Sequence, residues 1–177
     1  MKTLNVLSLS AMLAVALASL PGSTIAQQKS LKEQLVGTWT LVSCEVPADS
    51  IRQPFCVNPR GSLSLDASGR YTQVIAARGR PNATPGPNGL FNRADVKPEE
   101  YKAMAQGVVA SFGTWSVKEA DKTLTTHEEG ALFPNGDGGD GKRTLSLTGD
   151  ELKTVTVSTR YSTATPTATT LVWTRAK

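Results

Sequence analysis

The amino-acid sequence predicts an all-β protein, an antiparallel up-and-down β-barrel of about eight strands with one α-helix near a barrel mouth. Short segments in which apolar and polar residues alternate are separated by tight turns, as in strands joined by hairpins. Segment 35–44 is rich in β-branched and aromatic residues, and a glycine lies close to a tryptophan near its start. Its sequence Gly-Thr-Trp recurs at 113–115, which indicates that a second group of strands begins there.

The expected strands follow from the alternation and from the turn residues between them. They are 35–44, 61–66, 70–77, 113–118, 123–132, 142–147, 151–159 and 168–175. The residues from Asp66 to Gly69 suit a tight turn, which makes the second and third strands a hairpin. Segments 47–59 and 78–96 contain several prolines, which cannot donate ladder hydrogen bonds, so we expect loops there.

One helix is expected after the second loop. Asp95 can cap it, Pro98 suits its first turn, and two glutamates follow where the helix dipole favours negative charge. Apolar residues then recur at helical spacing, namely Tyr101, Met104, Ala105, Val108 and Phe112. This single stripe indicates a helix that packs on the sheet or covers a barrel mouth.

The N-terminal segment has the order of a secretory signal peptide. Lys2 is followed by an apolar run from Val6 to Leu20 and then by small residues up to Ala26. The run is too short to span a membrane comfortably, although a buried helix or an anchor is the alternative. We therefore expect a signal peptide over 1–26, one barrel domain over 27–177, a periplasmic or secreted location, and no stable membrane insertion after cleavage.

Cys44 and Cys56 are the two cysteines of the chain. In an exported protein, two cysteines that flank a short loop predict a disulfide. A loop of roughly a dozen residues corresponds to about 3 kcal/mol of stabilisation in the chain-entropy treatment. The chain has no Cys-x-x-Cys motif and a single histidine, which argues against a metal or redox pair.

The formal net charge of +4 comes from dispersed basic residues, which favours solubility over nucleic-acid binding. No nucleophile elbow and no phosphate-binding glycine-rich loop occur, so no cofactor is expected. Segment 135–140 is rich in glycine and aspartate and invites a calcium interpretation. Counted from Asn135, however, the twelfth position of an EF-hand loop is Ser146, so we expect a hairpin turn and no metal.

The chain resembles the bacterial lipocalin-like domain family, which has a calycin-type β-barrel. The matching residues occur in the family's order along the chain. They are Leu35 to Trp39, Gly61, Asp66 to Gly69, Arg78, Pro81, Pro98 to Tyr101, Gly113 to Trp115, His127, Phe133 to Asn135, Arg143 and Trp173 to Arg175. The loops over 81–90 and 134–141 depart from the family pattern, which bears on ligand choice because both flank the barrel openings.

The resemblance implies a barrel that is closed at one end and holds a small hydrophobic or amphipathic molecule. In lipocalins, a tryptophan of the first strand packs under an arginine of the last strand. By position these are Trp39 and Arg175, and with Gly37 they are expected to close the barrel. The family mostly lacks an assigned activity, so the resemblance implies architecture more than function.

Four side chains are candidates for ligand contacts, namely Tyr71, Trp115, His127 and Arg143. Arg143 could bind an acidic head group through two hydrogen bonds, or could pair with Glu128 or Glu129. The two aromatic residues could line a pocket or belong to the core.

His127 is the single histidine, and two interpretations are open. Imidazole titrates near neutrality and could accept a proton or a hydrogen bond inside the barrel, as the family match favours. Strand alternation instead places His127 and Leu124 on opposite faces of the strand, with Leu124 on the core face. His127 would then be half exposed or hydrogen-bonded to a neighbouring strand.

We therefore expect an exported protein that binds a small hydrophobic or amphipathic ligand inside the barrel. Two alternatives remain. One is an acid–base enzyme of the isomerase or cyclase type that acts on such a ligand through His127. The other is a filled barrel that serves as a protein-interaction module, which would lack a pocket of about 300 Å³ or more.

Overall fold

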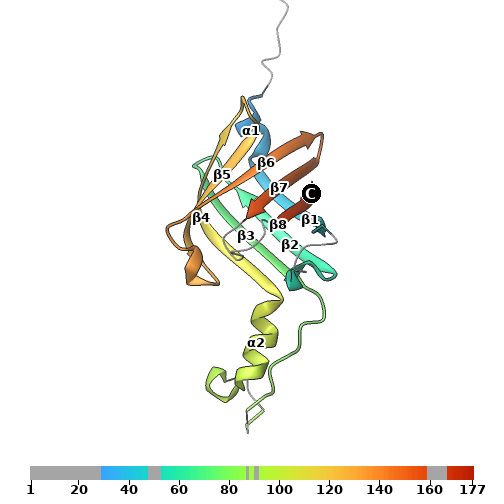
Figure 1. Ribbon diagram of the computed structural model, residues 1–177, viewed down its shortest axis with the longest axis vertical. Coiled ribbons are helices and arrows are strands. Elements are labelled where there is room, and N and C mark those ends of the chain that lie inside the picture. Colours follow the sequence, from blue (N-terminus) through green and yellow to red (C-terminus); the bar gives the residue numbers. More distant parts are fainter. Residues whose placement is uncertain (1–28, 48–52, 87, 90–91, 159–166) are drawn as a thin grey trace, which may run out of the picture.

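The computed structural model describes residues 29–47, 53–86, 88–89, 92–158 and 167–177, so the expected signal peptide over 1–26 lies outside the described residues. Eight antiparallel strands form a closed barrel (Figure 1), which confirms the expected fold class. The strands are β1 (Gly37–Glu45), β2 (Pro59–Leu65), β3 (Arg70–Ala77), β4 (Val108–Lys118), β5 (Thr123–Ala131), β6 (Asp140–Thr148), β7 (Glu151–Ser158) and β8 (Thr167–Arg175). Each strand pairs with the next, and β8 pairs with β1.

Two α-helices lie at opposite ends of the barrel (Figure 1). Helix α1 (Leu31–Leu35) precedes β1 and begins with a capping box formed by Ser30 and Glu33. Helix α2 (Pro98–Gln106) lies between β3 and β4 and projects from the other end, the mouth. Short 3-10 turns are present at Pro54–Cys56 (η1), Arg93–Asp95 (η2) and Pro134–Gly136 (η3).

The expected helix was too long. Its apolar stripe was extended to Val108 and Phe112, but β4 already begins at Val108. Lys97, and not Asp95, is the residue before the helix, and Asp95 belongs to η2. Helix α2 has no buried residue, so of the two expected arrangements it does not pack on the sheet, and it lies at the mouth end of the barrel. Val108 to Phe112 pairs in register with β3, and this tertiary pairing decides against helix continuation.

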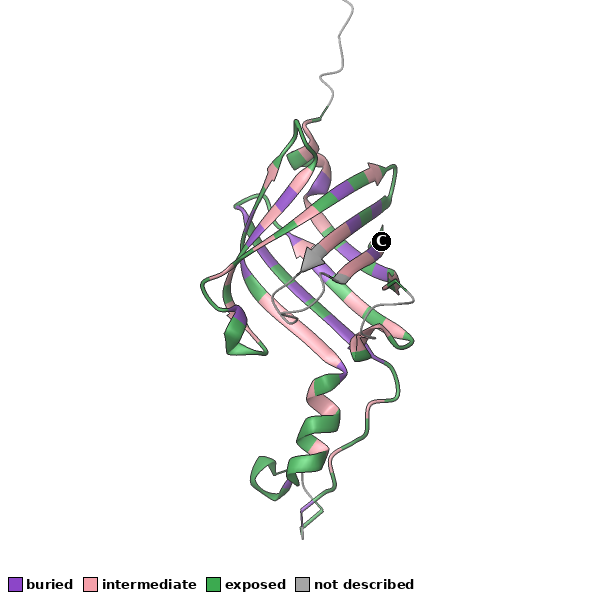
Figure 2. Ribbon diagram, in the orientation of Figure 1, coloured by how far each residue is buried: buried purple, intermediate pink, exposed green. Residues whose placement is uncertain are grey.

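Alternation along each strand gives the barrel an apolar interior. In β3 the burial alternates between buried and exposed from Arg70 to Val74, as the sequence pattern predicts. Buried positions recur along the strands of the barrel (Figure 2). The buried apolar side chains form one cluster, and we call its members in α1 and at the adjoining strand ends the floor: Leu35, Trp39, Leu65, Trp115, Leu124, Leu152 and Trp173. The floor therefore closes the end of the barrel opposite the mouth.

A bulge between Phe112 and Gly113 brings β4 and β5 unusually close. A Cβ atom at position 113 would lie 2.0 Å from the carbonyl oxygen of His127, so no side chain fits there. Bulges increase the local twist of a strand, which a closed barrel of this size requires.

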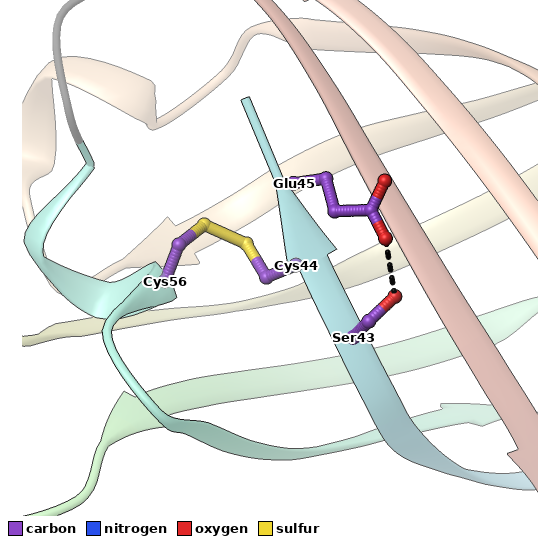
Figure 3. Close-up of a disulfide and its surroundings, with 4 residues drawn as sticks. All are labelled: Ser43, Cys44, Glu45 and Cys56. Atoms are coloured by element: carbon purple, nitrogen blue, oxygen red, sulfur yellow. Dashed lines mark hydrogen bonds between the residues drawn. A yellow bond between two sulfur atoms is a disulfide. The ribbon is translucent and has the colours of Figure 1, made fainter. Parts of the chain in front are cut away.

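The expected disulfide is present between Cys44 and Cys56 (Figure 3). It joins the end of β1 to η1, with 5.1 Å between the two Cα atoms. Phe55, the middle residue of η1, packs against the hydrophobic core. The bond thus holds η1 against the barrel wall near the mouth.

The glycine-rich segment between β5 and β6 forms the expected hairpin connection. It contains η3, and the Asp137 carboxylate accepts a hydrogen bond of 2.8 Å from the backbone N–H of Ala131. The backbone N–H of Gly138 donates to the carbonyl of Glu128 at 2.7 Å. These hydrogen bonds stabilise the conformation of the turn.

Within the described ranges, no helix is long and apolar enough to cross a membrane.

Candidate functional site

Arg175 closes the floor end of the barrel from outside. Its guanidinium carbon lies 4.3 Å from the ring centroid of Trp39, the stacking that the family resemblance implies. The Nη1 and Nη2 atoms donate to the carbonyls of Val36 and Gln34 at 3.1 and 2.7 Å. Since these carbonyls lie at the C-terminal end of α1, Arg175 also caps this helix. The two hydrogen bonds hold α1 over the floor end of the barrel.

Gly37 makes this closure possible. Its φ of +139° is a conformation that other residues rarely adopt, and a Cβ atom there would lie 3.0 Å from Nη1 of Arg175. The ring of Trp39 is fully buried, and its Nε1 donates to the carbonyl of Leu35 at 3.0 Å. Strand β1 and helix α1 are therefore tied together through the same indole.

Trp115 belongs to the floor. It is 4% exposed, and its Nε1 donates to the backbone carbonyl of Asp66 at 3.0 Å. The ammonium group of Lys32 lies 5.8 Å from the ring centroid, on the side of α1. Trp115 thus packs within the hydrophobic core cluster.

Burial along the inner wall falls from the floor to the mouth on β4 to β8, whereas Ile75 and Ala77 keep the mouth end of β3 buried. Inward-facing residues near the floor, such as Leu124 and Leu152, are fully buried. Further along the same strands and their neighbours, inward-facing residues are only half-buried: Ser111, Glu128, Arg143, Thr156 and Thr169. Solvent therefore reaches the β4 to β8 part of the wall in the mouth half, where close packing of a solid core would exclude it.

The structure brings Tyr71 and Arg143 together with residues that the sequence did not single out. We call the set the inner polar group: Tyr71, Gln73, Ser111, Thr126, Glu128 and Arg143. The Tyr71 hydroxyl lies 3.2 Å from Oγ of Ser111 and donates to it. Thr126 is fully buried, and its hydroxyl donates to the carbonyl of Gly141 at 3.4 Å.

Charges within the inner polar group act on one another. Burial raises the pKa of Tyr71, and the negative charge of Glu128 also raises it. The hydrogen bond between Tyr71 and Ser111 and the positive charge of Arg143 lower this pKa. Burial lowers the pKa of Arg143, whereas Tyr71 and Glu128 favour its charged form. The charges of Arg143 and Glu128 therefore interact inside the barrel.

Gln73 is the member of the group with an unmet hydrogen bond. It is 5% exposed, and its Oε1 has no hydrogen-bond partner within the described structure. Gln73 pairs with Leu63 in β2 and with Ser111 in β4. It is the next inward-facing residue of β3 after Tyr71, so the two side chains are neighbours on the inner face of the barrel. The alternation of β3 could have identified it, because it places a polar residue between Tyr71 and Ile75 on the core face.

His127 lies on the outer surface and outside the inner polar group. Its side chain is 49% exposed, and Nδ1 lies 2.8 Å from Oδ1 of Asp140 on the paired strand β6. Its neighbour Glu129 also faces outward and pairs with Arg70 at 2.8 Å. The structure thus has the cross-strand hydrogen bond that strand alternation favours.

Within the part of the chain that the structure describes, no group of three or more His, Cys, Asp or Glu side chains could hold a metal ion. The polar atoms available in the interior are hydroxyl, amide, guanidinium and carboxylate groups. Such an arrangement can bind a polar head group by hydrogen bonds above an apolar floor.

Comparison with known proteins agrees with this architecture. A search of curated protein sequences finds no match to the chain. The profile of the lipocalin-like domain family, in contrast, matches residues 36–176, from the residue before β1 to the residue after β8. Because this match covers most of the sequence and the structure is a closed eight-stranded antiparallel barrel, the chain belongs to the lipocalin-like domain family.

Proposed function

We propose that this protein is exported and binds a small hydrophobic or amphipathic molecule inside its barrel. One observation carries the proposal: in the mouth half, inward-facing residues of β4 to β8 are only half-buried, above a floor of buried aromatic and aliphatic side chains. An apolar body can enter such a space, and a few polar groups can orient it.

The inner polar group supplies candidate contacts for the polar end of the ligand. Tyr71 and Arg143 are the two sequence candidates that lie in it, and Trp115 lies below them in the floor. We leave His127 out of the proposed site because its side chain is on the outer surface. For the same reason, no observation favours the acid–base enzyme, which depends on this residue.

Export is supported by the disulfide between Cys44 and Cys56 and by the signal-peptide pattern of the sequence. Structural disulfides persist in oxidising compartments, such as the periplasm and the extracellular space. We therefore propose that the ligand is met outside the cytoplasm. A filled barrel that binds proteins finds less support, because such a barrel would bury its inward-facing residues throughout.

Native mass spectrometry of the protein purified from the periplasm tests this proposal. The expected spectrum contains a species heavier than the polypeptide, which loses a small apolar or amphipathic molecule on collisional activation. A fluorescent amphiphile should bind to the emptied protein with one site per chain.

Arg143→Met and Lys142→Met form a matched pair, because both remove one positive charge from β6 but only Arg143 faces inward. We expect Arg143→Met to change the amphiphile's affinity and Lys142→Met to leave it within about twofold, since rim and surface charges contribute little. Equal effects of the two variants, or no bound probe at all, would contradict binding in the interior.

A further inference from the structure

We propose that the interior selects an uncharged amphipathic ligand whose polar end is a hydrogen-bond donor, an alcohol or an amide N–H, directed at Oε1 of Gln73. This inference rests on the proposed function, and it adds the chemical class of the ligand.

The first argument is the buried amide of Gln73. An amide oxygen without a partner in a buried position is costly, and most such groups in proteins are satisfied. Oε1 of Gln73 has no hydrogen-bond partner in the structure, although the side chain is 5% exposed. A ligand that donates a hydrogen bond to this oxygen would remove the free-energy cost of leaving the oxygen buried without a partner. The removal of this cost would contribute to the free energy of ligand binding.

The second argument is the position of Gln73 at the boundary between apolar and polar surfaces. On β3 it lies between Tyr71 and Ile75, which both belong to the hydrophobic core cluster, and Tyr71 adds a polar hydroxyl on one side. The Cα partner of Gln73 on β4 is Ser111, the acceptor of the Tyr71 hydroxyl. A hydroxyl held at Gln73 would therefore have other hydroxyl groups beside it and apolar side chains on the opposite flank.

The third argument is the charge balance of the interior. Among the inward-facing strand residues that the structure describes between the floor and the mouth, Arg143 and Glu128 are the ones that carry charge. Each contributes to the electrostatic environment of Tyr71, with opposite sign. An ionised carboxylate would gain attraction from Arg143 but would meet repulsion from Glu128 and from the oxygen of Gln73. An uncharged donor meets neither repulsion.

Three probes with the same ten-carbon chain separate these possibilities: 1-decanol, decyl methyl ether and decanoate. The alcohol can donate a hydrogen bond, the ether can only accept one, and decanoate is ionised at pH 8. Their affinities are measured by displacement of a fluorescent amphiphile from the full protein. We expect the alcohol to bind about five- to tenfold more tightly than the ether, because a single net hydrogen bond is of this size.

Gln73→Met keeps the length of the side chain and removes the acceptor. In this variant we expect equal affinities for alcohol and ether, with the ether affinity within about twofold of the wild-type value. Thr72→Val is the matched control, because Thr72 is the adjacent residue on the exposed face of β3, and it should keep the alcohol preference. The wild-type preference for alcohol over ether tests the inference by itself if Gln73→Met does not fold.

The outcomes distinguish the inference from the proposed function. Binding of all three probes without preference for the alcohol, or a preference that persists in Gln73→Met, refutes the inference and leaves binding in the barrel intact. Tightest binding of decanoate, lost in Arg143→Met, also refutes it and assigns an anionic head group instead. Binding of none of the probes or of the fluorescent amphiphile contradicts the proposed function itself.

Discussion

Replacing Trp39 by alanine tests the closure of the barrel at its floor. The indole is fully buried among the floor residues, so its removal leaves a cavity that the rigid ends of β1 and β8 cannot fill. Substitutions of buried Trp or Phe by Ala cost about 3–5 kcal/mol. The variant also loses the hydrogen bond to the Leu35 carbonyl and the stacking of Arg175 at 4.3 Å, so we expect a value of about 4–5 kcal/mol.

Urea denaturation followed by circular dichroism gives the free energy of unfolding, and thermal denaturation should show a midpoint lowered by about 8–20 °C. Thr40→Ala is the control, because Thr40 is the exposed neighbour of Trp39 on β1, and its effect should stay within about 0.5 kcal/mol. A loss below about 1 kcal/mol for Trp39→Ala would show that the indole does not close the barrel.

Four further predictions concern the floor, the disulfide, the outer surface and acid stability. Gly37→Ala should lower the free energy of unfolding by more than about 1 kcal/mol, because φ is +139° and the new Cβ would crowd Arg175; urea denaturation equal to wild type contradicts this. The double variant Cys44→Ser, Cys56→Ser should lose about 3 kcal/mol in the same assay, and no loss would show that the disulfide does not constrain the unfolded chain. His127→Ala should leave the affinity for a fluorescent amphiphile unchanged, since the imidazole faces outward. A clear loss of affinity would show that His127 contributes to the binding site. Hydrogen bonds from the Arg70 backbone and the Ser68 hydroxyl lower the pKa of Asp66 in the folded protein. The ionised Asp66 carboxylate therefore stabilises the fold above the unfolded pKa, and this stabilisation is lost as the pH falls through the folded pKa. Asp66→Asn should narrow the difference between the free energies of unfolding at pH 6 and pH 3, and an unchanged difference refutes this.

The sequence alone was sufficient for the strands whose alternation and turns are both clear. The expected bounds of β3 are those observed, because a period-two pattern lies between the turn at Asp66 to Gly69 and a proline-rich loop. The helix was extended too far because Val108 and Phe112 fit both a helical stripe and a strand. Pairing with β3, which local pattern cannot show, decides between the two.

The candidate site was predicted in part. Tyr71 and Arg143 were chosen one by one, and only the closure of the sheet shows that they face a common interior with Glu128. Gln73 was missed because a glutamine in a strand is usually taken as a solvent-facing residue, although the alternation of β3 places it inward. For His127 the same alternation, counted from Leu124, favoured the outer face that the structure shows.

The central claim is that the mouth half of the barrel is an accessible interior that binds an apolar body. Intermolecular nuclear Overhauser effects between 1-decanol and the methyl groups of the protein test this most directly. The account predicts signals to the inward-facing methyl groups of Ile75, Val109 and Thr156, and none to Thr72 and Val74 on the outer face of β3. Signals to the outer methyl groups alone would contradict it, because the molecule would then bind on the outside of the barrel.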